Sequence, residues 1–234
     1  MAAVSRVLVI AAHPDDEILG CGGTAARLVA EGHDLHFAIL GEGITSRSAQ
    51  RSDADASQLE TLHRQARAAA AAVGVKKLVL HKLPDNRLDT VPLLEVVKLV
   101  EDLVQQVQPE IIYTHHGGDL NVDHGVIHRA VLTATRPVAG QPVKEIYAFE
   151  VPSSTEWAFG RTAPAFRPNV FVEITATLEA KVTAMECYES EARAFPHPRS
   201  PEALRALATR WGSVAGCAAA EAFELVRSIR PRAN

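Results

Sequence analysis

The turn His13-Pro14-Asp15-Asp16-Glu17 holds the residues of this chain that are best suited to chemistry. Imidazoles and carboxylates are common zinc ligands, and a catalytic zinc site uses three protein ligands and leaves one position open. His13 and Asp16 supply two such ligands. Asp15 adds a spare carboxylate that can take a proton from metal-bound water. The turn therefore indicates a metal site with hydrolytic chemistry.

A second cluster of imidazoles and carboxylates lies between His115 and His124. His124 is the best third ligand because it stands near the start of a predicted helix. It follows Asp123, which can hydrogen-bond and orient an imidazole behind the metal. His128 lies one helical turn further on the same side. It can be a ligand, a group behind the ligands or the wall of the site, and a partly buried structural histidine is the favoured interpretation.

Apolar runs alternate with helical patterns, and each cluster directly follows an apolar run. We expect strands at residues 6–11, 34–40, 76–81, 110–114, 144–149 and 169–174. We expect helices at residues 21–31, 55–73, 91–107, 124–135, 176–190, 201–210 and 213–228. This order predicts an α/β fold of the Rossmann-like kind: a doubly wound, mostly parallel sheet with helices on both faces. Ligands bind at the carboxyl ends of the strands in such sheets, so both clusters face one crevice if their strands are neighbours.

The first motif and the Asp119–His124 segment together resemble the PIG-L/LmbE-like zinc deacetylase family. The resemblance covers most of the chain, through the order of elements and the Tyr188-Glu189-Ser190 region. It implies one deacetylase domain over residues 1–234 and removal of an acyl group, usually acetyl, from amino sugars or related conjugates. It also implies zinc, although iron(II), cobalt or nickel are compatible with the same ligand types.

The resemblance assigns roles residue by residue. His13 and Asp16 match the first two zinc ligands of the family, and His124 matches the third. Asp15 matches the general base, and Asp123 matches the aspartate that precedes the third ligand.

The chain departs from the family where Asn121 replaces a histidine that helps to stabilise charge developing on the substrate carbonyl. An amide donates a hydrogen bond but supplies no proton at pH 7. We therefore expect Asn121 or His116 to act as the donor to the oxyanion, and His116, His115 or His128 to take the role of proton donor.

A second departure concerns substrate binding, because Leu62 stands where the family often has an arginine. Arg47 and Arg51 in the preceding loop are the predicted replacements and can hold a phosphate or carboxylate. Asp85 and Asn86 follow another strand and can bind sugar hydroxyls, although ordinary turn chemistry also explains them. The segment 195–200 can close over the pocket, with a rigid proline-rich linker as the favoured alternative.

Composition excludes several classes of function. The chain has 234 residues, 47% hydrophobic, with a formal net charge of −4, which gives no electrostatic argument for nucleic acid or an anionic membrane. No apolar run approaches the roughly 20 residues of a transmembrane helix. Three scattered cysteines without a CxxC pair predict a reducing, cytoplasmic location. We expect the long segment 151–168 to form a flap or an oligomer contact, which makes a homo-oligomer plausible.

Two other functions compete with a metal-dependent enzyme. Gly20-Cys21-Gly22-Gly23 is similar to a dinucleotide-binding loop, but Ala25 stands where the last glycine of that motif belongs. The preceding aspartates would also repel a pyrophosphate. A non-catalytic module with a structural metal is the second alternative, but such a site prefers four protein ligands and has no use for a spare base.

Overall fold

The computed structural model describes residues 4–45, 56–161 and 163–230 of the chain. Its seven strands form one sheet in the order β3-β2-β1-β4-β5-β7-β6. They are β1 (Arg6–Ala11), β2 (Asp34–Gly41), β3 (Lys77–Leu83), β4 (Ile111–His115), β5 (Glu145–Phe149), β6 (Val170–Glu173) and β7 (Ala220–Ser228). The pairs among β1 to β5 are parallel, whereas β7 runs antiparallel to both β5 and β6. The predicted fold class is thus confirmed.

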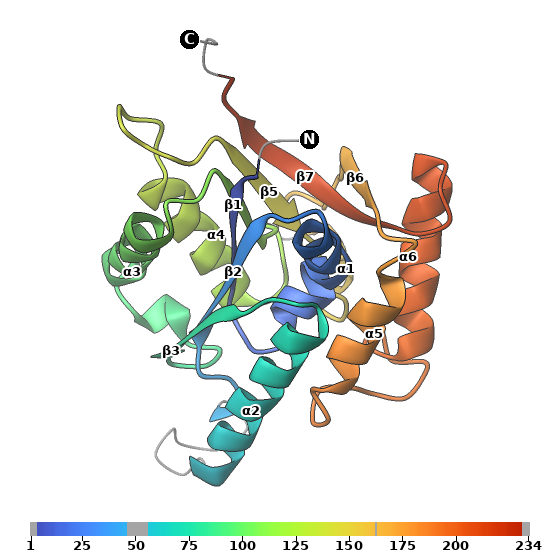
Figure 1. Cartoon of the computed structure of the whole chain (residues 1–234). Coiled ribbons are helices and arrows are strands. Elements are labelled where there is room, and N and C mark those ends of the chain that lie inside the picture. Colours follow the sequence, from blue (N-terminus) through green and yellow to red (C-terminus); the bar gives the residue numbers. More distant parts are fainter. Residues whose placement is uncertain (1–3, 46–55, 162, 231–234) are drawn as a thin grey trace.

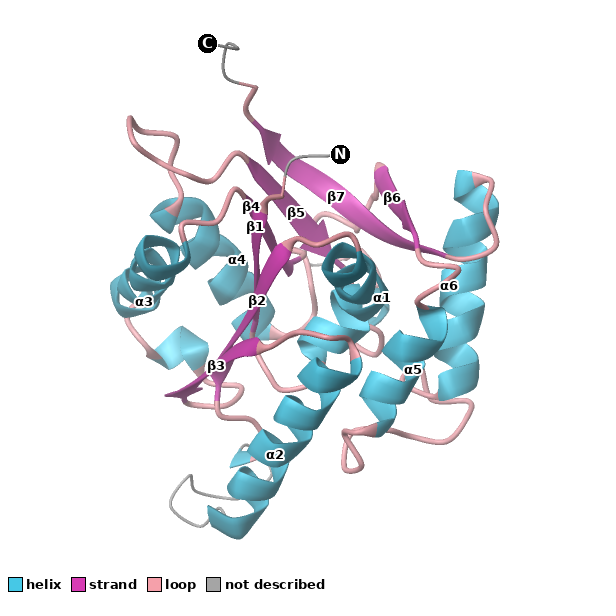
Figure 2. Cartoon of the chain, viewed as in Figure 1, coloured by secondary structure: helices cyan, strands magenta, loops and turns pink. Residues whose placement is uncertain are grey.

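Helices cover both faces of the sheet (Figures 1 and 2). The α-helices are α1 (Asp16–Ala30), α2 (Ala56–Ala72), α3 (Leu93–Val107), α4 (Val122–Ala134), α5 (Leu178–Glu186) and α6 (Pro201–Ala215), and the short 3-10 helices are η3 (Leu88–Thr90) and η4 (Glu156–Ala158). Strand residues alternate between two apolar cores, as the pleat of a strand requires. Val7 and Val9 of β1 pack in one core with α1, α2 and α5, and Leu8 and Ile10 pack in the other with α3 and α4.

The strand order reverses next to β1. From β1 the chain passes through α1 to β2 on one side, and after β3 it returns through α3 to β4 on the other side. The carboxyl ends of β1 and β4 therefore flank the switch point, where open α/β sheets bind their ligands. The described residues contain no helix that is long and apolar enough to cross a membrane.

The prediction of a helix at residues 213–228 is wrong. Helix α6 ends at Ala215, where Gly216 takes a left-handed conformation (φ 76°), and the following segment forms the strand β7. The intrinsic helix propensity of the Ala- and Glu-rich stretch is small, roughly a few tenths of a kcal/mol per residue. Pairing with β5 on one side and β6 on the other outweighs that preference. Helix α1 also begins earlier than expected, at Asp16.

Candidate active site

The turn between β1 and α1 is closed by its own hydrogen bonds. The backbone N–H of Asp16 donates to the carbonyl of His13 (3.2 Å), and the backbone N–H of His13 donates to Asp16 Oδ2 (2.8 Å). Asp15 adopts a φ of 111°, which L-residues rarely take. Its side chain makes no capping bond to α1 and instead lines the adjoining pocket. The turn thus places three polar side chains at the end of β1.

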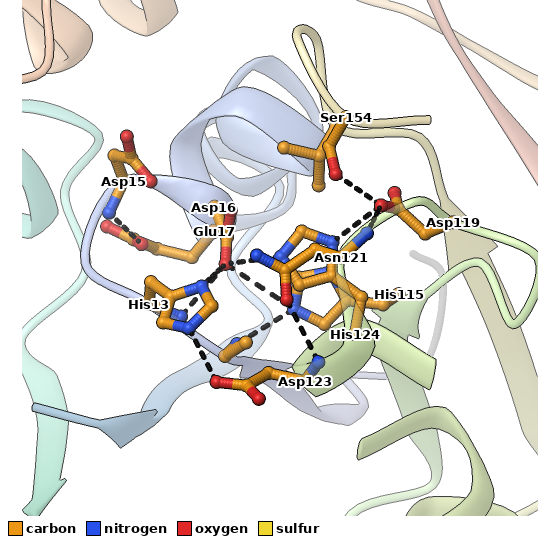
Figure 3. A network of polar contacts seen from close by, with 12 residues as sticks. His13, Asp15, Asp16, Glu17, His115, Asp119, Asn121, Asp123, His124 and Ser154 are labelled. Carbon is orange, nitrogen blue, oxygen red and sulfur yellow. Dashed lines mark hydrogen bonds and ion pairs between the residues drawn. The ribbon is translucent and has the colours of Figure 1, made fainter. Parts of the chain in front are cut away.

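The N-terminus of α4 carries His124, the remaining predicted ligand. Asn121 is the N-cap residue of this helix, and its Oδ1 accepts a hydrogen bond from the backbone N–H of Asp123 (2.9 Å). Asparagine is among the best N-cap residues, so the local sequence explains why the helix begins here. His124 consequently lies in the first turn of α4, beside the turn that follows β1 (Figure 3).

Ligand atoms of His13, Asp16 and His124 all lie within 4.8 Å of one another. Asp16 Oδ2 is 3.3 Å from His13 Nδ1 and 3.2 Å from His124 Nε2 (Figure 3). Asp16 and His124 are buried, and the side chain of His13 is 12% exposed toward the pocket. Both ring nitrogens of His124 are buried, and in the described part of the chain each has a carboxylate oxygen at 3.2 Å but no hydrogen bond of good geometry. Two nitrogens and one carboxylate that converge beside a pocket fit a divalent metal ion with an open position.

Two further carboxylates orient the imidazoles from behind. Asp123 Oδ2 lies 2.9 Å from His13 Nε2, and Asp119 Oδ1 lies 3.2 Å from His124 Nδ1. A carboxylate on one ring nitrogen holds the proton there and leaves the other nitrogen free as a ligand. Asp85 Oδ1 also lies near His13 Nε2, at 3.4 Å. The arrangement therefore presents His13 Nδ1 and His124 Nε2 to the same point.

The charges around His13, Asp16 and His124 favour a cation between these three side chains. Burial by itself would lower the pKa of His124, but the carboxylates of Asp16 and Asp119 raise it to about 9. Burial lowers the pKa of His115, whose ring stacks on that of His124 with 3.9 Å between centroids. Excess carboxylate charge in a buried cluster stabilises any cation placed there, whether a proton or a metal ion.

Asp15 lies in the same pocket and faces a cation from a distant segment. Arg199 Nη1 is 2.5 Å from Asp15 Oδ2. Burial raises the pKa of Asp15 well above its usual value, and the guanidinium of Arg199 acts in the opposite direction. The backbone N–H of Asp15 donates to Glu17 Oε2 (3.1 Å), and Glu17 in turn accepts a hydrogen bond from Tyr188 (2.6 Å).

The pocket contains most of the residues that the sequence singled out. Asp85, Asn86 and Asn121 line it together with His13 and the two aspartates, and Asn121 Nδ2 donates to Asn86 Oδ1 (2.8 Å). Arg47 and Arg51 lie outside the described residues.

The structure does not bring His116 or His128 into the pocket. His116 Nδ1 is 2.6 Å from Glu224 and its Nε2 is 2.9 Å from the carbonyl of Pro164, so contacts elsewhere engage both ring nitrogens. His128 Nδ1 lies 2.8 Å from the carbonyl of His115. The expected donor role of His116 has no geometric support, and His128 takes the structural place that the sequence favoured.

Sequence reasoning missed the wall of the pocket opposite α2. Arg199, Glu191, Ser153 and Ser154 all line the pocket. The sequence offered two signals. The segment 195–200 contains Arg199, with closure over the pocket as the less favoured prediction, and the segment 151–168, predicted to form a flap or an oligomer contact, contains the two serines. Leu62 also lines the pocket, at the position where an arginine was looked for.

The sequence matches the family model described as PIG-L, GlcNAc-PI de-N-acetylase, over residues 8–135, which is more than half of the chain. This chain belongs to the PIG-L family. The matched region runs from β1 to the C-terminus of α4 and includes the whole proposed ligand set. The resemblance in the sequence is thereby confirmed.

Relatives of this PIG-L member have more than one activity. Diacetylchitobiose deacetylase of Thermococcus kodakarensis is 26% identical over 239 residues, covering 97% of this chain and 85% of that protein. The 4-oxalmesaconate hydratase of Pseudomonas putida is 26% identical over 197 residues, covering 77% of this chain and 71% of that protein. The crystal structure of the conserved protein TT1542 from Thermus thermophilus superposes with a TM-score of 0.74 at 23% identity, covering 98% of both chains. That structure supports the fold alone.

Proposed function

We propose that this PIG-L member is a zinc-dependent N-deacetylase that removes an acetyl group from an amino sugar or a small conjugate of one. One observation carries the proposal: His13, Asp16 and His124 bring their ligand atoms within 4.8 Å of one another, beside a pocket that Asp15 also lines. Three ligands that leave a position for water, with a neighbouring carboxylate as base, suit amide hydrolysis at a metal.

Each side chain has a distinct task in this reaction. Zinc, when bound, makes water more acidic and polarises the acyl carbonyl. Asp15 accepts the proton of the attacking water and returns it to the leaving amine. Asp123 fixes the tautomer and orientation of His13 through the 2.9 Å contact to its Nε2.

Asn121 is the best placed donor to the developing oxyanion. Its amide gives one hydrogen to Asn86 and lines the pocket, and a primary amide carries a second hydrogen. A well-positioned donor of this kind contributes about 3–4 kcal/mol to the transition state. Because Asn121 releases no proton, proton return to the amine rests on Asp15.

Recognition of the sugar falls to the loop after β3. Asp85 and Asn86 line the pocket and offer a carboxylate and an amide to sugar hydroxyls. Arg47 and Arg51 remain our proposal for binding an anionic group of a larger conjugate.

The test is release of amine and acetate from a panel of N-acetylglucosamine conjugates by zinc-loaded protein. D15N is expected to abolish most turnover while zinc content stays at the wild-type level. H124A is expected to lose zinc on dialysis. Normal turnover by D15N would refute the assignment of the base, and full zinc retention by H124A would refute the ligand set. Hydration of an unsaturated acid without any amine release would replace the proposed reaction.

A further inference from the structure

Arg199 reaches the pocket from the connection between α5 and α6, 184 residues away from Asp15 in sequence. Besides Asp15, its Nη1 lies 3.4 Å from Glu191 Oε2, and its Nε donates to Ser153 Oγ (2.8 Å). The side chain of Arg199 is 22% exposed and that of Asp15 is 3% exposed. Two segments that are separate in sequence, around Ser153 and Glu191, therefore hold the guanidinium in place over the carboxylate.

The contact between Arg199 and Asp15 matters because the turn places Asp15 next to a proposed metal ligand. Asp15 is adjacent in sequence to the ligand Asp16, and a free carboxylate beside a divalent ion readily becomes another ligand. A ligating carboxylate would fill the open position and could no longer accept a proton from water. Nothing in α1 prevents this, because Asp15 makes no side-chain capping bond to the helix.

We propose that Arg199 is a positioning residue that holds the carboxylate of Asp15 away from the metal and keeps it free to act as the base. The inference rests on the ligand set and the base of the proposed function. The guanidinium competes with the metal for the same carboxylate, and it does so through Oδ2 of Asp15. An arginine suits this task because it stays charged and holds a fixed geometry when it is partly buried.

The surroundings of Asp15 give no other described residue the same task. Besides Arg199, the charged side chains with the largest effect on it are Asp16, Glu17 and Glu191, and all three are acidic. Leu62, on the other wall of the pocket, is apolar. Removal of Arg199 therefore leaves the carboxylate with a metal ion as the strongest positive charge nearby.

The experiment compares cobalt(II)-substituted wild type, R199A and R199K by visible absorption. Cobalt d–d bands weaken as the coordination number rises, so they report directly on a new ligand. R199A is expected to show weaker bands than wild type, and the D15N/R199A double variant is expected to return to the wild-type spectrum. R199K, which keeps a positive charge but loses the fixed geometry of the guanidinium, is expected to lie between wild type and R199A. R193Q is the matched control, because Arg193 lies in the same connection and its hydrogen bonds within the described residues go to the backbone carbonyls of Ser190 and Ala192.

Turnover gives a second readout. R199A is expected to lose about 10–100-fold in kcat, the range usual for groups that orient an active-site residue, with KM little changed and guanidinium ion restoring part of the loss. A cobalt spectrum of R199A identical to wild type would overturn the proposal, as would a spectral change that persists in D15N/R199A. A rise in KM alone would make Arg199 a substrate anchor instead. If wild type releases no amine from any conjugate, the proposed function fails, while the spectra still decide the role of Arg199.

Discussion

Replacement of Asp123 by asparagine tests the tautomer that the site imposes on His13. Asp123 Oδ2 contacts His13 Nε2 at 2.9 Å, and its Oδ1 accepts the backbone N–H of Leu88 at 2.9 Å. In D123N the amide oxygen can keep the bond to Leu88, so its NH₂ group must face His13. His13 Nε2 then has to accept a hydrogen bond from this NH₂ group. The ring proton therefore moves to Nδ1, the proposed ligand atom, which lies 3.3 Å from Asp16 Oδ2.

The expected loss of zinc affinity follows from the hydrogen bond between residue 123 and His13 Nε2, whose direction is reversed in D123N. A hydrogen bond to a charged group contributes ~1.5–3 kcal/mol. Since 1.4 kcal/mol is a factor of ten in an equilibrium constant, the Kd for zinc should rise ~10–150-fold. The fold should persist, because the partner of Leu88 is retained and the side chain changes by one atom.

Competition with a chromophoric zinc chelator measures this Kd, and thermal unfolding of the metal-free protein checks the fold. D89N is a matched control, because Asp89 is exposed on the neighbouring η3. An unchanged zinc Kd in D123N would refute the tautomer argument. A comparable drop in D89N would show that general charge, and not the contact to His13, is responsible.

Two predictions concern groups outside the pocket. K181M should destabilise the protein by ~3–5 kcal/mol in urea unfolding, because it leaves the buried carboxylate of Glu221 without its 2.6 Å cation; an unchanged midpoint would contradict this. Burial opposes both charged forms, yet the pair raises the pKa of His116 above 6.5 and lowers that of Glu224 below 4.5. The difference in unfolding free energy between wild type and H116Q should therefore be largest between pH 4.5 and 6.5. It should shrink at higher pH, where His116 loses its proton, and at lower pH, where Glu224 gains one; a difference that does not depend on pH would refute this.

The sequence was sufficient for the part of the site that is local. His13, Asp15 and Asp16 lie in one turn, and a strand followed by a helix puts that turn at the carboxyl edge of the sheet. The structure also brings His124 to this turn, and the sequence indicated its place because it stands near the start of a predicted helix and follows Asp123. Short-range rules of capping and periodicity determine both placements, so a reader of the sequence can apply them.

His116 shows where a local reading failed although a signal was present. His115 is the last residue of β4, and successive residues at a strand end point to opposite faces. His115 stacks on His124, so the neighbouring His116 turns away, toward Glu224 of β7. Histidines that are close together in the sequence are thus separated in space by the period of the strand. For Arg199 the sequence indicated only that the segment 195–200 could close over the pocket, because its contact to Asp15 spans 184 residues.

The element that the sequence reading missed, β7, also supports the helix of the active site. Helix α1 departs from helical geometry at Cys21 (φ −147°, ψ 23°), which frees backbone groups on both sides of the kink. Glu221 of β7 accepts the N–H groups of Gly23 (3.0 Å) and Thr24 (2.7 Å), and Lys181 donates to the carbonyl of Leu19 (2.8 Å). Buried backbone groups need such partners. The kinked helix that carries Asp16 therefore depends on a carboxylate from the far end of the chain, and neither the kink nor the strand is predictable without the other.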